Sequence, residues 1–204
     1  AVIAFVLYVV AAGWNISDML VNVQPPHWLL SVNMLFFFVF AVLHANEQLG
    51  TRAMLVFLLT VFVVSFVFET VGVLTGAIYG QYYYTHRLGP KLGVVPFLIP
   101  IAWFMMMYAS YAVAQVIAGK HPKALIGTLW FALLGAMAMT AWDLGMDPQM
   151  VVRGHWVWVQ GGAYFGIPVQ NFVGWLATTF TGFLLFRLYE NSQPWRAYQL
   201  KDRF

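Results

Sequence analysis

Long apolar runs alternate along this chain with short polar segments that are rich in proline and glycine. A helix that crosses a bilayer needs about 20 consecutive, mostly apolar residues. Runs that meet or approach this length cover residues 28–45, 53–79, 96–118, 124–142 and 169–188. The hydrophobic pattern therefore predicts five transmembrane helices in this part of the chain.

A sixth apolar run covers residues 1–14, at the start of a chain that begins with Ala1 rather than Met. No basic residue precedes it and no clear cleavage site follows it, so we interpret it as a first transmembrane helix rather than a signal peptide. The expected fold is an all-α, polytopic membrane helical bundle of about six transmembrane helices, forming a single integral membrane domain over residues 1–204. Prolines such as Pro148 and Pro168 are expected at the edges of these helices.

The basic residues of the loops predict an orientation, because cytoplasmic loops carry more Lys and Arg. With six spans, one side carries Arg52, Lys120, Lys123, Arg187 and the basic C-terminal tail, and the other carries Arg87, Lys91 and Arg153. We expect a cell-membrane protein with both termini in the cytoplasm. The same count of spans places the loops 80–95 and 143–167 on one membrane face.

The composition narrows the class of protein further. Hydrophobic residues make up 62% of the 204 residues and charged residues 8%, whereas a soluble domain carries roughly 25% charged residues. The absence of cysteine excludes disulfides and thiolate chemistry, and the net charge of +3 indicates no nucleic-acid partner. Aromatic residues reach 18%, which suits interfacial belts and also contact with a long unsaturated lipid.

Two carboxyl groups follow the run 124–141, in the segment Trp142-Asp-Leu-Gly-Met-Asp-Pro148. Asp143 and Asp147 are four residues apart, so they share one face if the helix continues. They are expected where hydrocarbon gives way to headgroups. Two neighbouring, partly desolvated carboxyls can hold one proton between them at neutral pH. The segment is therefore a candidate proton donor beside an apolar substrate, or alternatively a helix cap and loop anchor.

Glu69 lies inside an apolar run, after Val61-Phe-Val-Val-Ser-Phe-Val-Phe68. A charged side chain at the centre of a bilayer costs roughly 2.5–3.5 kcal/mol on insertion scales. An acidic residue in this position predicts a functional site. The alternative is a structural hydrogen bond to a neighbouring helix.

Glycines and tyrosines follow Glu69 at close spacing. Gly72, Gly76 and Gly80 recur every four residues and predict a smooth stripe along the third helix, which suits close helix packing or a groove for a rigid polyene. The third helix is expected to close with a group of aromatic residues, namely Tyr79, Tyr82, Tyr83 and Tyr84. Such tyrosines are typical of an interfacial belt, and their faces also stabilise cations.

The sequence shows no motif for a metal or a redox cofactor. The five histidines have no metal-ligand spacing, and no Gly-x-Gly-x-x-Gly segment opens a strand–helix unit. We therefore expect no cofactor and no metal, and acid–base chemistry if there is any chemistry. Asn171 is expected to form a cross-helix hydrogen bond or to orient a water molecule.

Taken together, several of these segments are similar to the CruF-type carotenoid biosynthesis proteins, a family that includes bisanhydrobacterioruberin hydratase and gamma-carotene hydratase. The resemblance covers about residues 65–190. It rests on Glu69-x-x-Gly72, Tyr79-Gly-Gln-Tyr82, Leu88-Gly-Pro90, Val95-Pro-Phe-Leu-Ile-Pro100, Trp103, Trp142–Pro148, Trp156-x-Trp158 and Tyr164–Pro168 with Asn171 and Trp175. It implies addition of water to a terminal isoprenoid double bond of an acyclic carotenoid, without a redox cofactor.

The roles of single residues are our own hypothesis, which the resemblance does not supply. Asp143 and Asp147 are expected to be the acid pair, with Glu69 as their partner or as the base that orients water. The residues expected to stabilise the cation or bind substrate are Tyr79, Tyr83, Trp142, Trp156, Asn171, Gly72 and Gly76. The expected partners are a carotenoid or another long isoprenoid lipid, the membrane, and other carotenoid enzymes or a pigment–protein complex.

Other functions stay open on the sequence. The same chain suits a non-catalytic carotenoid-binding subunit of a pigment–protein complex. It also suits another acid–base isoprenoid enzyme, such as a membrane lycopene cyclase, because cyclisation too begins with protonation of a terminal alkene. A transporter is a weaker alternative, since paired inverted repeats are not evident.

Overall fold

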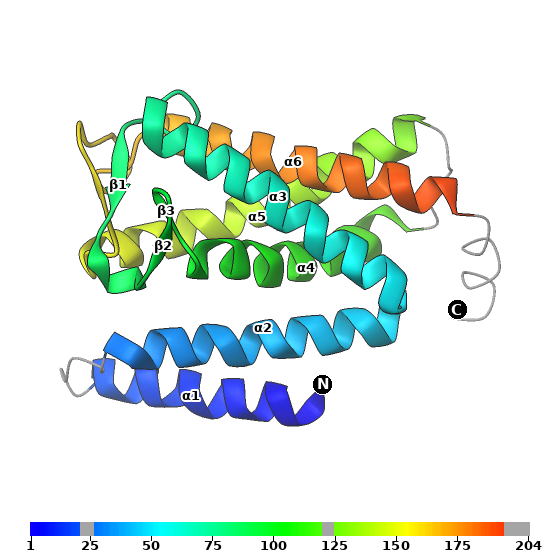
Figure 1. Ribbon diagram of the computed structural model, residues 1–204, viewed down its shortest axis with the longest axis horizontal. Helices are drawn as coiled ribbons and strands as arrows, with labels where there is room; N and C mark the ends of the chain where they lie inside the picture. The colour runs from blue at the N-terminus through cyan, green and yellow to red at the C-terminus, as the bar shows by residue number, and fades with distance from the viewer. Residues whose placement is uncertain (21–26, 120–124, 194–204) are drawn as a thin grey trace.

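The computed structural model describes residues 1–20, 27–119 and 125–193, and in this part of the chain helices dominate (Figure 1). The helices are α1 (Val2–Leu20), α2 (His27–Leu49), α3 (Thr51–Thr75), α4 (Leu98–Ala118), α5 (Leu125–Val152) and α6 (Val169–Ser192). The short elements are β1 (Tyr82–Tyr84), the 3₁₀ helix η1 (His86–Leu88), β2 (Lys91–Leu92), β3 (Val95–Pro96) and β4 (Trp156–Trp158).

Five of these helices, α2 to α6, are long and apolar enough to cross a membrane, and α1 adds the shorter apolar stretch Val2–Trp14. The expected all-α membrane bundle is confirmed. Helices α3, α4, α5 and α6 pack together, and the α1–α2 hairpin lies along one side of them, with α2 against α4 and α3 (Figure 1). Interlocked rings fill the core: Phe57 of α3 lies against Phe186 of α6, with ring centroids 4.5 Å apart, and against Phe104 of α4 at 5.6 Å.

The two loops expected on one membrane face do meet. Strand β1 pairs antiparallel with β4, and the register places Tyr82 opposite Trp158 and Tyr84 opposite Trp156. A second small hairpin joins β2 to β3. These strands close one end of the bundle, at the left of Figure 1.

The expected glycine stripe on the third helix is wrong beyond Gly72. Helix α3 ends at Thr75, and Gly76 caps it in the left-handed conformation, with φ of 69°. A residue with a side chain rarely adopts such a φ, so glycine at this position lets the chain leave the helix. Gly80 has φ of 97° and packs against Pro168, at the start of α6, instead of extending a helical face.

The expectation that Pro148 lies at a helix edge is also wrong, because α5 continues beyond the apolar run, through Pro148, to Val152. A proline inside a helix has no N–H for the carbonyl four residues earlier, which is here the carbonyl of Leu144. The hydroxyl of Tyr164 donates a hydrogen bond to that carbonyl over 2.9 Å. The loop before α6 thus satisfies the backbone group that Pro148 leaves unpaired, and both Asp143 and Asp147 lie on the helix.

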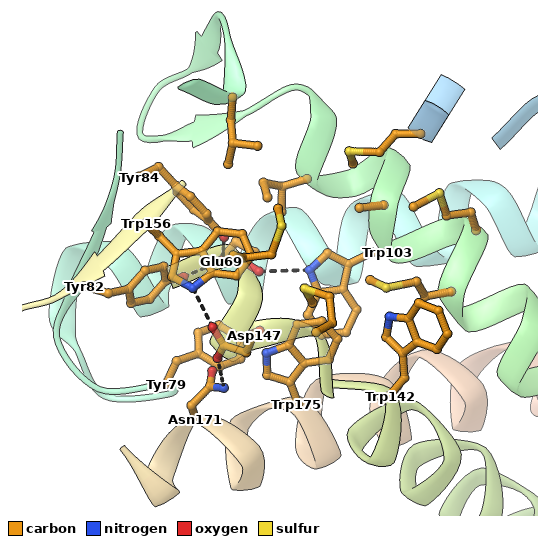
Figure 2. A pocket seen from close by; sticks show the side chains of 18 of the residues that line it. Glu69, Tyr79, Tyr82, Tyr84, Trp103, Trp142, Asp147, Trp156, Asn171 and Trp175 are labelled. Carbon is orange, nitrogen blue, oxygen red and sulfur yellow. Dashed lines mark hydrogen bonds between the residues drawn. The ribbon is translucent and has the colours of Figure 1, made fainter. Parts of the chain in front are cut away.

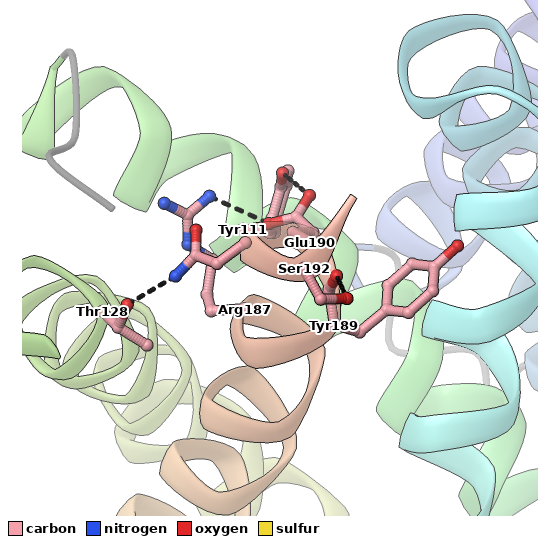
Figure 3. Close-up of polar contacts among 7 residues, drawn as sticks. Tyr111, Thr128, Arg187, Tyr189, Glu190 and Ser192 are labelled. Atoms are coloured by element: carbon pink, nitrogen blue, oxygen red, sulfur yellow. Dashed lines mark hydrogen bonds and ion pairs between the residues drawn. The ribbon is translucent and has the colours of Figure 1, made fainter. Parts of the chain in front are cut away.

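At the opposite end of the bundle, Arg187 is buried and is not a loop charge that marks orientation. Its Nη1 contacts Oε2 of Glu190 at 2.9 Å, and Tyr111 donates to the other oxygen of Glu190 over 2.8 Å (Figure 3). The guanidinium also lies over the ring of Phe131, 4.6 Å from its centroid. This ion pair joins α4, α5 and α6, since a buried charge needs a partner of opposite charge.

Candidate functional site

A cavity of about 200 Å³ lies between the strand-closed end of the bundle and the α1–α2 hairpin (Figure 2). Its walls are mostly aromatic and methionine side chains, with a few polar groups among them. The polar residues of the lining are Asn33, Glu69, Asp147 and Asn171, together with the tyrosines Tyr8, Tyr79, Tyr82 and Tyr84. Such a mostly apolar pocket with a few converging polar groups is typical of a small-molecule site.

Glu69 is the first of two carboxyl centres in this cavity, and only 4% of its surface is exposed. The hydroxyls of Tyr82 and Tyr84 both donate to Oε2, the latter over 2.7 Å. The indole of Trp103, on α4, donates to Oε1 over 2.9 Å. The cross-helix hydrogen bond that was the structural alternative for Glu69 is therefore present, on a carboxyl that also faces a cavity.

The strand geometry of β1 explains which tyrosines reach Glu69. Successive side chains of a strand point to opposite faces, so Tyr82 and Tyr84 point inward while Tyr83 points outward and is 51% exposed. Burial raises the pKa of Tyr82 and Tyr84 well above the usual value for tyrosine, and the negative charge of Glu69 raises it further. Both phenols therefore stay neutral hydrogen-bond donors at physiological pH.

Asp143 and Asp147 form the second carboxyl centre, one helical turn apart on α5, with 0% and 1% of their surfaces exposed. The amide of Asn171, on α6, donates to both: to Oδ2 of Asp143 over 2.9 Å and to Oδ2 of Asp147 over 2.8 Å. The indole of Trp156 donates to Oδ1 of Asp147 over 2.7 Å. The cavity lining includes Asp147 but not Asp143, so Asp143 lies behind its partner.

The β1–β4 pairing connects the two carboxyl centres. Tyr84, which donates to Glu69, is the cross-strand partner of Trp156, which donates to Asp147. Their rings meet edge to face, with centroids 6.0 Å apart. The paired strands β1 and β4 therefore position a donor for Glu69 and a donor for Asp147 next to each other (Figure 2).

Tyr79 explains the glycines at this end of α3 and α6. A Cβ on Gly72 would lie 2.5 Å from one side of the Tyr79 ring, and a Cβ on Gly174 would lie 2.5 Å from the other. The Tyr79 hydroxyl is hydrogen-bonded to Thr178 at 2.8 Å, and burial raises its pKa well above the usual value. Gly72 thus makes room for a cavity-lining ring without itself lining the cavity, and Gly76 serves as the helix cap.

Two stacked indoles, Trp103 and Trp175, form another part of the wall, with centroids 4.4 Å apart. Trp142 also lines the cavity, yet 54% of its surface is exposed. Trp142 therefore has one part of its surface in the cavity wall and another part exposed on α5, one of the helices long and apolar enough to cross a membrane.

Apart from tyrosines, the ionisable side chains that line this cavity are carboxylic acids. Among the described residues, those that line it include no Lys, Arg or His, and no group of three or more His, Asp or Glu side chains has the arrangement of a metal site. The carboxyls are held by neutral O–H and N–H donors instead. Such a site can give and take protons next to an apolar ligand.

The structure brings most of the candidate residues together and leaves a few outside. Glu69, Tyr79, Trp142, Asp147, Trp156 and Asn171 line the cavity, Asp143 contacts it through Asn171, and Tyr83, Gly72 and Gly76 do not line it. The residues whose roles the sequence did not suggest are Tyr82, Tyr84, Trp103 and Trp175. A β-strand pattern in Tyr82–Tyr84 was the available signal for the first two.

Comparison with known proteins identifies the family. A family model described as "Carotenoid biosynthesis protein" matches residues 29–201, which includes every residue of the two carboxyl centres. The chain belongs to this carotenoid biosynthesis family. It is 34% identical over 123 residues to bisanhydrobacterioruberin hydratase of Haloarcula japonica, a match that covers 60% of this chain and 41% of the relative. No solved structure matches this carotenoid biosynthesis protein.

Proposed function

We propose that this carotenoid biosynthesis protein is a hydratase that adds water to a terminal isoprenoid double bond of an acyclic carotenoid and produces a tertiary alcohol. The observation that carries the proposal is the pair of carboxyl centres at one cavity with mostly aromatic and methionine walls, in a bundle of helices apolar enough to cross a membrane. Membership of a carotenoid biosynthesis family and the similarity to a protein named as a hydratase support the substrate class.

The Asp143–Asp147 centre is the proposed proton donor. One amide, that of Asn171, serves both carboxyls, and two negative charges so close in a buried place repel each other, which favours a proton shared between them. Asp147 lines the cavity and delivers the proton to the less substituted carbon of the alkene. Asp143 supports it from behind as a positioning residue.

A tertiary carbocation forms at the more substituted carbon. Aromatic faces stabilise cations through their quadrupoles, and the lining places the rings of Tyr79, Trp156 and Trp175 in the same cavity as both carboxyl centres. The absence of lysine and arginine from the described lining also favours a positively charged intermediate.

Glu69 is the proposed acceptor of the second proton. Three donors stabilise its carboxylate form, so it suits a base that orients water toward the cation. Water forms the new C–O bond and loses a proton to Glu69. Return of that proton to the aspartate pair through water completes a cycle in which one alkene and one water give one alcohol, with no oxidant or reductant.

The direct test is expression in a host that accumulates an acyclic carotenoid, followed by mass analysis of the pigments. A hydratase adds the mass of one water for each end that reacts. A cyclase yields pigments of unchanged mass, and a non-catalytic pigment-binding subunit yields unchanged pigment that copurifies at fixed stoichiometry. Either of these two results would contradict the proposed hydratase function and support the cyclase or the pigment-binding subunit instead.

The location that fits this proposal is the cell membrane, with both termini in the cytoplasm. Without Arg187, the sequence still gives the proposed inner side more basic residues, because Arg52, Lys120, Lys123 and the three of the C-terminal tail outnumber Arg87, Lys91 and Arg153. Of these inner residues, Lys120, Lys123 and the tail lie outside the residues that the structure describes. In this proposal a carotenoid enters from the bilayer beside Trp142, which both lines the cavity and is exposed. Other carotenoid enzymes are the proposed partners that supply it.

A further inference from the structure

Asn33 is a polar residue on the α2 wall of the cavity, away from both carboxyl centres in sequence. It lines the cavity, and its Oδ1 is buried, yet this oxygen accepts no hydrogen bond from the residues that the structure describes. A buried acceptor without a donor is costly, and such atoms are rare in folded proteins. The position of Asn33 therefore calls for an explanation that the fold itself does not supply.

The surroundings of Asn33 are apolar. Its neighbours on the same face of α2, Met34 and Phe37, also line the cavity, and Phe37 stacks on Tyr8 of α1 with centroids 4.8 Å apart. Packing alone would be served equally well by leucine at position 33. The asparagine is thus the polar exception on a wall suited to hydrocarbon.

The α1–α2 hairpin that carries Asn33 is fixed to the rest of the bundle from its other half. Nδ1 of His44 and the hydroxyl of Tyr108 are 2.7 Å apart in a hydrogen bond, and Phe38 meets Phe104 edge to face at 5.6 Å. These contacts hold α2 on α4. They leave the Asn33 end of the helix as a wall whose side chains are available to a ligand.

The chemistry of the missing donor follows from the amide oxygen, which can only accept. The hydrocarbon part of a carotenoid offers no donor. A hydroxyl on the carotenoid end group and a water molecule each offer an O–H. We propose that Asn33 is a specificity residue whose Oδ1 binds an O–H group at the α2 wall, carried either by the substrate or by the water that the reaction consumes. This inference rests on the proposed hydratase function.

The test compares the wild type, Asn33→Leu and the matched control Asn46→Leu, which makes the same substitution on α2 outside the cavity lining. All three proteins are purified in detergent. Each is given two acyclic carotenoids that differ in a hydroxyl near the reacting double bond. Dissociation constants come from quenching of tryptophan fluorescence, since five of the nine tryptophans line the cavity. Conversion is followed separately by mass, and thermal unfolding checks the fold of each variant.

If the O–H belongs to the substrate, Asn33→Leu weakens binding of the hydroxylated carotenoid by about tenfold and leaves the other unchanged. If it belongs to water, both carotenoids bind as before and kcat falls for both by a similar factor. Asn46→Leu changes neither binding nor kcat. Asn33→Leu unfolds at the same temperature as the wild type or higher, because it removes an unsatisfied polar atom.

Unchanged binding and unchanged conversion in Asn33→Leu would overturn the inference, as would an equal loss in Asn46→Leu. The proposed hydratase function fails separately, if the wild type converts neither carotenoid. In that case the dissociation constants alone test the role of Asn33. Asn33 then binds a substrate hydroxyl only if Asn33→Leu selectively weakens binding of the hydroxylated carotenoid.

Discussion

The amide of Asn171 and the carboxyl of Asp147 face each other across α6 and α5, with Nδ2 and Oδ2 2.8 Å apart, and the same amide also reaches Asp143. One neutral side chain thus holds two acidic ones in a buried place. The exposure of the two aspartates to the cavity nevertheless differs, because Asp147 lines it and Asp143 does not. This difference separates their expected roles.

We predict that Asp147→Asn lowers hydration by about 10²-fold or more, the usual contribution of a general acid. Asp143→Asn should lower it less, because the carboxyl that faces the substrate remains. Both substitutions preserve shape, so the variants should fold and bind carotenoid. The measurement is the amount of hydrated pigment, identified by its molecular mass, relative to the amount of protein in the membrane. Full activity in Asp147→Asn would remove this residue from the mechanism.

The donors on β1 provide a second prediction with an internal control. Tyr84→Phe removes a hydroxyl from Glu69, whereas Tyr83→Phe changes the neighbouring, outward-facing residue of the same strand. We expect Tyr84→Phe to reduce hydration about tenfold through loss of one hydrogen bond to a carboxylate, and Tyr83→Phe to have the activity of the wild type. Equal activities in the two variants would mean that the contact with Glu69 is not used in turnover.

The packing around Tyr79 predicts a difference between two helical glycines. Gly174→Ala places a methyl group 2.5 Å from the Tyr79 ring and 2.6 Å from the carbonyl oxygen of Ile78. We expect it to lower the free energy of unfolding by about 1–3 kcal/mol, as overpacked cores do. Gly145→Ala, where a Cβ would meet nothing within 4 Å, should instead stabilise α5 slightly through helix propensity. Unfolding temperatures of the purified variants compare the two, and equal temperatures would contradict the close packing.

The sequence predicted the helices well because a bilayer imposes their length and composition. It also grouped Glu69 with the aspartate pair, since few explanations exist for acidic residues in apolar runs, and the structure brings Glu69 and Asp147 to one cavity. The ends of helices were predicted less well. Pro148 indicated a boundary, but the hydroxyl that compensates for it comes from Tyr164, sixteen residues later and in a different element.

The tyrosine segment shows the same limit. The sequence pattern predicts that the third helix extends to these tyrosines, whereas the chain leaves the helix at Gly76 and forms a strand at Tyr82–Tyr84. The repeat of side-chain direction changes from about 3.6 residues in a helix to 2 in a strand. Because of this change, Tyr82 and Tyr84 face Glu69 and Tyr83 does not. Its cause is the pairing with β4, more than 70 residues away in the chain, which local pattern cannot reveal.

The buried phenols also predict how stability depends on pH. Burial raises the pKa of Tyr79, Tyr82 and Tyr84 well above 10 in the folded protein, whereas in the unfolded chain tyrosine ionises near 10. Above this pH the folded state binds more protons than the unfolded state, so the free energy of unfolding falls as the pH rises. Below it, both states hold these protons and the three tyrosines contribute no pH dependence.

The measurement is the unfolding temperature in detergent between about pH 8 and about pH 11, with tyrosinate absorbance recorded during unfolding. Tyr84→Phe should show a smaller decrease over this range than the wild type, because one raised phenol is gone, and Tyr83→Phe serves as the matched control. The absorbance should rise together with unfolding rather than before it. A rise that precedes unfolding in the wild type and is reduced in Tyr84→Phe would show that this phenol ionises in the folded protein, and the donors to Glu69 would then not be the protected neutral groups that the site requires.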